Sequence, residues 1–555
     1  MSADAAHPGD ESAAKAPAGL AGRIPLILLA LAVIGSAVFI LGLTSKITFI
    51  TDEWDLLLLR PGWGFGQLLD PFHEHTVIAP ALIYKVFQPV FGMDSARPYQ
   101  LAATGTFLLS CVLFFVYVRR RVGDWAALIM TALILFLGGA FEDLLWTFQI
   151  GYFGSLAAGL GALIALDRDD RRGDLWASAL LIVSVSFSSV GIPFIAGAVA
   201  EWLLNPRERK RRLLVMGAPV AFYAFWWLGW GSQAESELSL SNIPDLPSYL
   251  FTAISAGFTT IAGLATGDGS EPDQPHLIWG KLLFVAAVLL SAWRLRRRGE
   301  VPRGLLVVAA IGLSFYLLAG LNQSDLRPPE SSRYQLPSAV FILLVAAWVL
   351  QGIRFRPPVL AVAALVSALA IFNGLQLMKD QAEGRWQPSS SALLTSLGAI
   401  DVAGDEVRPG YTLLLGLEEP VPFEDYRRAT EDFGSPGKSA DELAAGDPAE
   451  RAAADSTLIT ALGLEMIGRL PRRHIKCVPL RPGDTYEVTG RSPDIKNRGD
   501  EDLGIGLTLF SDAPGTEIGS ILPEGSGGFN LPRHLATDRP WRIAITRGGP
   551  ATVCG

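Results

Sequence analysis

The chain has 555 residues, of which 50% are hydrophobic and only 18% are charged. An ordinary soluble domain carries about 25% charged residues, so this composition argues against a soluble protein. The formal net charge is -8, and no basic patch with interleaved aromatic residues occurs along the sequence. Nucleic acid is therefore not expected as a partner.

Long segments without a charged residue recur along the first two thirds of the chain. A helix needs about 20 apolar residues to cross a bilayer, because its backbone polar groups must be satisfied within the segment. The segments are Ile24–Leu43, Leu101–Val118, Leu144–Leu166, Leu175–Ala200, Leu213–Ala234, Gly304–Gln323 and Pro357–Met378. The first of them is longer than the apolar part of a signal peptide, about 7–15 residues, and no A-x-A-like cleavage site follows it. The sequence therefore predicts a polytopic α-helical protein of the lipid bilayer with a retained first span.

The charges between these segments predict the orientation in the plasma membrane. Basic clusters occur at Arg119–Arg121, Arg168–Arg172, Arg207–Arg212, Arg294–Arg298 and Arg354–Arg356, whereas acids occur at Asp52–Asp55, Glu142–Asp143, Glu235 and Glu237. Lys and Arg collect on the cytoplasmic side, so the acidic loops are expected outside. Basic residues flank Leu175–Leu204 on both sides, which predicts a hairpin broken at Ser186–Pro193. About eleven spans result, with the N-terminus cytoplasmic and the C-terminus extracytoplasmic.

Three regions are expected. Residues 1–22 form a disordered cytoplasmic tail, residues 23–379 the transmembrane domain with an external loop at 44–100, and residues 380–555 an extracytoplasmic soluble domain. In this last region, helices are expected near Phe423–Phe433 and Ser439–Ala445. Strands are expected at Tyr411–Leu417, Thr485–Thr489, Ile505–Phe510, Glu517–Leu522 and Trp541–Thr546. The pattern predicts an α/β part followed by a β-sandwich-like part, which either caps the membrane domain or binds carbohydrate; the cap is favoured.

Two of the three cysteines fall in this soluble domain. Outside the cytoplasm Cys477 and Cys554 can form a disulfide, and the alternative is two unpaired thiols. Cys111 lies in an apolar segment and is expected to serve packing only.

The acids that follow the first span are the first candidate site. Asp52, Glu53 and Asp55 lie at the outer mouth of a helix, where low dielectric and mutual repulsion raise the pKa of a carboxyl group. Such a group suits a general base, for which Asp52 and Glu53 are the candidates, or a ligand of a divalent cation. Asp55 beside them is expected to bind substrate. The alternative is a solvated turn.

His73, Glu74 and His75 lie in the same external loop. The spacing differs from the H-E-x-x-H pattern of zinc proteases. In an extended segment His73 and His75 would point the same way, towards a metal or, as we prefer, towards a substrate.

Two further candidates come from later loops. The adjacent acids Glu142 and Asp143 directly follow an apolar span, where they are costly unless solvated, paired or metal-bound. Arg333 and Tyr334 lie at the outer boundary before a later span. The guanidinium there either binds a phosphate through two hydrogen bonds or reaches lipid headgroups.

These features together resemble the GT-C superfamily of membrane glycosyltransferases, which includes protein mannosyltransferases, the aminoarabinose transferase and mycobacterial arabinofuranosyltransferases. The resemblance covers residues 23–379 and rests on many spans, an acidic motif in the first external loop and a C-terminal exterior domain. By this resemblance Asp52 matches the candidate catalytic base, and Glu142 and Asp143 match acids that bind a divalent cation, Mg or Mn, in some members. Arg333-Tyr334 resembles the pair that approaches the lipid phosphate. The W-W-D-x-G motif of oligosaccharyltransferases is missing, so transfer to asparagine is not implied.

The resemblance implies a hexosyl- or pentosyltransferase that moves a sugar from a polyprenyl-phosphate donor to a cell-envelope glycan or glycolipid. No cofactor is certain. Two alternatives remain: a transporter or flippase of envelope precursors, or a non-catalytic envelope assembly protein. A transporter is expected to carry its acids near the membrane midplane, whereas these acids lie at span ends.

Overall fold

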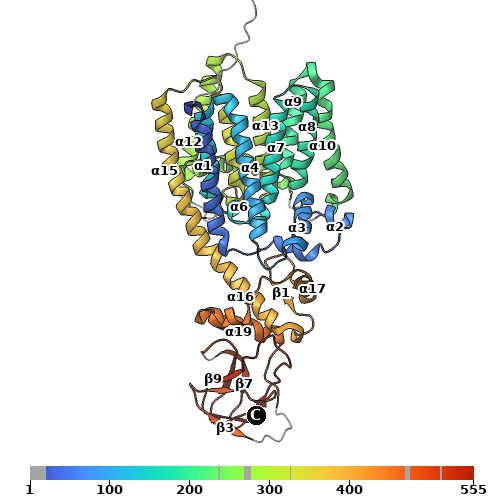
Figure 1. Ribbon diagram of the computed structural model, residues 1–555, viewed down its shortest axis with the longest axis vertical. Coiled ribbons are helices and arrows are strands. Elements are labelled where there is room, and N and C mark those ends of the chain that lie inside the picture. Colours follow the sequence, from blue (N-terminus) through green and yellow to red (C-terminus); the bar gives the residue numbers. More distant parts are fainter. Residues whose placement is uncertain are drawn as a thin grey trace, which may run out of the picture.

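The computed structural model describes residues 20–234, 238–267, 277–324, 327–468, 476–512 and 515–554. Most of the expected N-terminal tail, together with Glu235 and Glu237, lies outside the described residues. The molecule is elongated, with a bundle of helices at one end and the C-terminal domain at the other (Figure 1). We call the end of the bundle next to this domain the domain-facing end.

Eight helices within the described ranges are long and apolar enough to cross a membrane, or nine if one bent pair counts as a span. They include α1 (Leu20–Leu43), α4 (Arg97–Val122), α7 (Ile150–Leu166), α10 (Arg209–Gly229), α12 (Leu277–Arg298), α13 (Arg303–Leu321), α14 (Gln335–Val349) and α15 (Pro357–Gln381). The chain is therefore a multi-pass α-helical membrane protein.

The bent pair consists of α5 (Asp124–Leu135) and a segment that contains α6 (Phe141–Leu145), and its bend is 42°. The break lies against α15. A Cβ atom at Gly138 would sit 1.8 Å from the carbonyl oxygen of Gly374, so only glycine allows this approach. The glycine thus places α6 at the domain-facing end with its two acids.

The hairpin predicted at Ser186–Pro193 is present as α8 (Arg171–Phe187) and α9 (Gly191–Leu204). A Cβ atom at Gly191 would lie 2.5 Å from the backbone of Val185, which shows how tightly the chain turns. The two helices have 17 and 14 residues and are not among the eight or nine candidate spans of the described residues. The sequence predicts about eleven crossings, a number that is reached only if each helix of this hairpin is counted as a crossing.

Helix α11 (Leu246–Ile261) is not one of these crossings. Its first turn contacts Gly320 at the end of α13, and Thr260 near its other end donates a hydrogen bond to Gln335 at the start of α14. Both ends of α11 therefore lie at the same end of the bundle.

The C-terminal domain is reached by one nearly continuous helix. Helix α15 passes through a π-helical turn, Ala382–Trp386, into α16 (Gln387–Ala403). After it come β1 (Thr412–Leu413), β2 (Val421–Pro422), α17 (Phe423–Phe433), α18 (Ala440–Ala445) and α19 (Pro448–Leu462). Helices α17 and α18 occur where the sequence predicts them, and Ser439 and Glu442 form a capping box that starts α18. Helices α16 and α19 were not predicted.

The last part of the chain is a β-sandwich of two four-stranded antiparallel sheets. One has the order β3 (Cys477–Leu480), β10 (Ala551–Cys554), β5 (Asp494–Asn497) and β8 (Ser526–Gly528). The other has the order β4 (Thr485–Glu487), β9 (Arg542–Arg547), β6 (Leu503–Thr508) and β7 (Thr516–Ile521). Trp541 is 6% exposed and belongs to the core.

Two side-chain features hold this domain together. Cys477 and Cys554 are bonded, with an S–S distance of 2.04 Å, and join the neighbouring strands β3 and β10. The buried carboxylate of Asp455 in α19 accepts the backbone N–H groups of Leu509, Phe510 and Ser511, each at 2.9 Å. The second contact fixes the helical layer on the sandwich.

Candidate functional site

The candidate residues of four sequence segments meet at the domain-facing end of the bundle. The segments are the turn after α1, the first long loop, α6, and the short helix Ser332–Tyr334 that leads into α14. Figure 1 shows α2 (Phe65–Leu69) and α3 (Ile78–Phe91) of this loop between the bundle and the C-terminal domain. The acids are therefore at helix ends and not at the middle of the spans.

Asp52 lies in a tight turn, in which Trp54 N–H bonds to the carbonyl oxygen of Thr51 at 3.0 Å. Thr51 has a φ of 48°, a conformation that a β-branched residue rarely adopts. The Asp52 side chain is partly exposed. Burial raises the pKa of Asp52 to about 6, although the charges of His73 and Arg333 act to lower it. These two cations therefore lie near the carboxyl group.

Glu53 is only 1% exposed. Its Oε2 accepts the backbone N–H of Ile50 at 2.9 Å, and its Oε1 accepts the hydroxyl of Tyr84 at 2.8 Å. Burial raises the pKa of Glu53 to about 8. The sequence made Glu53 a catalytic candidate beside Asp52. In the structure both of its oxygens are engaged, so Glu53 shapes the turn and is not presented to a substrate.

Asp55 is paired with Arg60, whose Nε lies 2.6 Å from Asp55 Oδ2. Arg60 is 6% exposed and also donates to the carbonyl oxygens of Asp70 at 2.7 Å and Pro71 at 2.9 Å. The partner of Asp55 is a buried arginine that also bonds to other parts of the loop. Asp55 therefore stabilises the fold of this loop. The role of Asp55 in binding substrate, expected from the sequence, has no support in this arrangement.

Residues 73–75 are not extended, so the condition under which His73 and His75 would point the same way is not met. Phe72 and His75 exchange backbone hydrogen bonds at 3.0 and 2.9 Å, and His73 has a φ of 47°, so the segment is a tight two-residue turn. The two imidazoles consequently have different surroundings. His75 Nδ1 lies 2.6 Å from the hydroxyl of Ser189 in the α8–α9 turn, whereas His73 Nδ1 lies 3.7 Å from Glu418 Oε1.

Glu74 binds Arg327, with 2.7 Å between Oε1 and the guanidinium, and accepts the amide of Asn322 at 3.3 Å. Burial acts to raise the pKa of Glu74, but His75 and Arg327 outweigh it and lower the pKa. This pair joins the first loop to the segment before α14. Arg327, Ser189 and Glu418 were not singled out from the sequence, because no local pattern shows that these distant segments meet.

The structure brings Glu142, Asp143 and Arg333 together. Glu142 Oε2 accepts the backbone N–H of Arg333 at 3.0 Å and lies 4.0 Å from its Nε. Ser332 donates its hydroxyl to the carbonyl oxygen of Gly139 at 2.9 Å and accepts the N–H of Glu142 at 3.2 Å. The Ser332–Tyr334 turn is therefore fixed on α6 by several bonds. Tyr334 packs against Phe315, with 6.3 Å between ring centroids.

The two acids of α6 differ in how far their oxygens are engaged. Asp143 is fully buried, its Oδ2 accepts the N–H of Leu336 at 3.4 Å, and its Oδ1 has no hydrogen-bond partner among the described residues. One oxygen of Glu142 is also committed to a backbone N–H. No group of three or more His, Cys, Asp or Glu in the described ranges is arranged to hold a metal, so a divalent cation at these two acids would need water or substrate oxygens as its other ligands.

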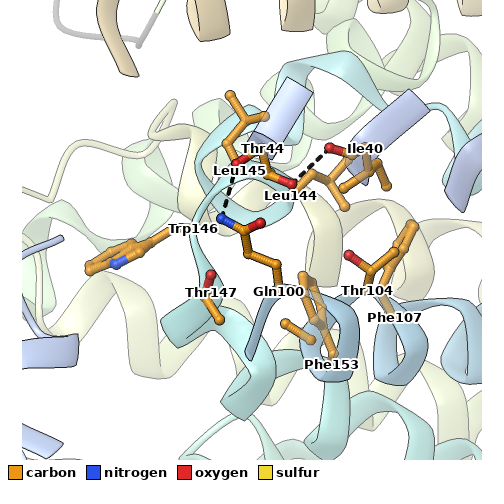
Figure 2. Close-up of a pocket in the computed structure, with 11 residues that line it drawn as sticks. Ile40, Thr44, Gln100, Thr104, Phe107, Leu144, Leu145, Trp146, Thr147 and Phe153 are labelled. Atoms are coloured by element: carbon orange, nitrogen blue, oxygen red, sulfur yellow. Dashed lines mark hydrogen bonds between the residues drawn. The ribbon is translucent and has the colours of Figure 1, made fainter. Parts of the chain in front are cut away.

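A small pocket lies beside the site, between α1, α4 and the α6–α7 connection (Figure 2). Its wall is mostly apolar, from side chains such as Phe107 and Phe153. The one amide in it belongs to Gln100, whose Nε2 donates to the carbonyl oxygens of Thr44 at 2.9 Å and Ile47 at 2.8 Å. Gln100 thus fixes the chain that leads from α1 to Asp52.

A second hollow includes Ser332 in its lining. It is bordered by α11 and the start of α14, and its polar lining residues are Thr259, Thr260, Thr266, Glu330, Ser332 and Gln335. Hydroxyl, amide and carboxylate groups of this kind form hydrogen bonds with sugar hydroxyls.

No protein-family model and no curated protein matches this sequence. Among solved structures, the fold is similar to ArnT from Cupriavidus metallidurans bound to undecaprenyl phosphate, with 14% identity, a TM-score of 0.44, and 76% of this chain and 86% of that chain covered. It is also similar to the archaeal oligosaccharyltransferase AglB from Archaeoglobus fulgidus in complex with an inhibitory peptide and a dolichol-phosphate, with 13% identity, a TM-score of 0.43, and 81% and 69% covered. Both are GT-C glycosyltransferases, the superfamily that the sequence resembles. Because the TM-scores are below 0.5, these similarities carry no argument about function, which must be inferred from the residues of the site.

Proposed function

We propose that this protein is a membrane glycosyltransferase that uses a polyprenyl-phosphate sugar as donor and Asp52 as its catalytic base. One observation carries the proposal. Of the three acids in the turn after α1, Asp52 alone is bonded to no other residue in the described part of the chain, accepting only its own backbone N–H. Glu53 and Asp55 are both engaged in the fold of the loop.

The pKa of Asp52 supports this role. A general base works best when its pKa lies near the operating pH, and burial raises the pKa of Asp52 to about 6. An ordinary aspartate titrates at about 3.9 and would accept a proton from a hydroxyl less readily.

The proposed reaction is a single displacement. The acceptor hydroxyl gives its proton to Asp52 as its oxygen attacks the anomeric carbon. The bond between that carbon and the phosphate oxygen breaks, and the lipid phosphate leaves with the electron pair, so the anomeric configuration is inverted. Arg333, whose charge acts on Asp52, is the group that holds the phosphate.

The charge distribution supports an extracytoplasmic site. Basic residues such as Arg121 and Arg212 lie at the far end of the bundle, beside Asp167 and Asp174. By the preference of basic residues for the cytoplasm, the N-terminus is inside and the C-terminal domain outside. There the sugar, a hexosyl or pentosyl unit, would pass to an envelope glycan or glycolipid. The position of the acids at helix ends speaks against a transporter.

The binding of undecaprenyl phosphate to the purified protein tests the role of Arg333. Native mass spectrometry should show about 10- to 100-fold weaker binding for Arg333→Gln than for wild type, because hydrogen bonds to charged groups contribute about 1.5–3 kcal/mol. Arg354→Gln, which changes an exposed arginine between α14 and α15, is the control and should bind as wild type. Equal binding by all three proteins would contradict the proposal.

A further inference from the structure

The C-terminal domain touches the turn that carries Asp52. Gly416, in the loop between β1 and β2, lies against Thr51, and a Cβ atom at position 416 would sit 2.7 Å from Thr51 Cγ2. Gly416 has a φ of 82° and Thr51 a φ of 48°. Two backbone segments with positive φ, a conformation that residues other than glycine rarely adopt, thus face each other beside the candidate base.

The same loop reaches the second turn of the site. Glu418 lies 3.7 Å from His73 Nδ1, and the φ of His73 is 47°. Strained residues of this kind persist only where the surroundings hold them. The two strained turns at the domain-facing end of the bundle, those of Thr51 and His73, are therefore in contact with residues 416–418.

We propose that the loop between β1 and β2 is a positioning element of the active site, which holds the turns of Thr51 and His73 so that Asp52 faces the substrate. The site is then incomplete without the C-terminal domain. The inference deepens the proposed function and rests on it for the identity of the base, but the contact itself is independent of any activity.

Other contacts keep the domain docked when this one is changed. Phe433 accepts the N–H of Met93 at 2.7 Å, Ser390 accepts the N–H of Thr48 at 3.3 Å, and Gln387 donates to the carbonyl oxygen of Leu43 at 2.9 Å. In Figure 1, β1 and α17 accordingly lie next to the α2 and α3 end of the bundle. A substitution at Gly416 therefore tests the positioning of the turn and not the docking of the whole domain.

The chain offers a matched control for that substitution. Gly410 has a φ of 74°, close to that of Gly416, but a Cβ atom there would meet nothing within 4 Å. Gly416→Ala and Gly410→Ala thus share the backbone strain of an alanine at positive φ, and only the first presses on Thr51. Thr51→Ser removes the Cγ2 atom in question and should relieve the pressure.

Hydrogen–deuterium exchange of the full-length protein in detergent, without substrate, tests the contact. Gly416→Ala should raise the exchange rate of residues 48–56 by about 10-fold, Gly410→Ala should leave it unchanged, and Thr51→Ser should restore protection in the Gly416→Ala background. Equal rates in the two alanine variants, or no restoration by Thr51→Ser, would overturn the inference.

Sugar transfer measured on the same proteins separates this inference from the proposed function. We expect a lower kcat with an unchanged KM for Gly416→Ala, wild-type values for Gly410→Ala, and recovery in the double variant. An unchanged kcat in Gly416→Ala would overturn the positioning role. The expected exchange pattern without any transfer by the wild type would support the contact and reject the proposed function.

Discussion

The carboxylate of Glu142 accepts the backbone N–H of Arg333 at 3.0 Å and so joins two segments that are 191 residues apart in the sequence. This bond fixes the backbone of the residue that we assign to the donor phosphate. It gives α6 a role that requires no metal: the helix holds Arg333 in place.

Substitutions at Glu142 distinguish the effect of its hydrogen bond to Arg333 from the effect of its negative charge. Glu142→Gln keeps an oxygen that accepts the Arg333 N–H, whereas Glu142→Ala leaves that N–H without its partner. We expect binding of undecaprenyl phosphate to fall about 10-fold in Glu142→Ala and by less than about 3-fold in Glu142→Gln, since an unmade buried hydrogen bond costs about 1–3 kcal/mol. Equal losses in both variants would show that the negative charge matters and not the bond.

The pH dependence of transfer reports on Asp52. A base must be deprotonated to act, so kcat/KM should rise with pH and level off above the pKa of about 6. His73→Gln removes a cation that acts to lower the pKa of Asp52, so the midpoint should move to higher pH. A midpoint near 4, or a downward shift in the variant, would speak against Asp52 as the base.

The far end of the bundle contains a buried ion cluster, and its disruption should lower the free energy of unfolding. Arg212 is 2% exposed and lies 3.3 Å from Asp174, which is 3% exposed. Arg212→Gln leaves Asp174 with one cation, Arg211, in place of two, so the loss should be smaller than the about 3–5 kcal/mol of a buried charge left without any partner. Thermal unfolding in detergent should show a clear loss for Arg212→Gln and none for Lys210→Gln, an exposed neighbour. Similar melting of the two variants would contradict the assignment.

The bond between Cys477 and Cys554 closes a segment with a sequence separation of 77 residues. Cys477→Ser should destabilise the sandwich by about 2–4 kcal/mol, because the unfolded domain gains conformational freedom. Chemical denaturation of the full-length protein measures the effect. Dithiothreitol should lower the stability of the wild type to that of the variant and should leave the stability of the variant unchanged. An unchanged stability of the wild type in dithiothreitol would contradict the prediction.

Local sequence patterns predicted much of the fold. Basic residues on both flanks of Leu175–Leu204, together with the break at Ser186–Pro193, indicated the hairpin of α8 and α9. The helix α19 was missed. Its alanine-rich sequence has few large apolar residues and therefore no clear apolar periodicity.

The sequence predicted candidate residues for the site but not how these residues contact one another. The turn at His73 depends on a positive φ at a residue other than glycine, which no local signal announces. The burial of Arg60 and the engagement of Glu53 arise from tertiary contacts with α3 and with distant parts of the loop. For the same reason the approach of Gly416 to Thr51 could not be inferred from a sequence in which the two lie in different domains.

Mass spectrometry of polyprenyl-phosphate sugars and envelope glycans tests the central claim most directly. The strains to compare are the source organism without this gene and the same strain complemented with wild type, Asp52→Asn or Asp70→Asn, an exposed acid of the same loop. We predict that a glycan is lost and its lipid-linked donor accumulates without the gene, and that wild type and Asp70→Asn restore both while Asp52→Asn does not. Full restoration by Asp52→Asn would contradict the account.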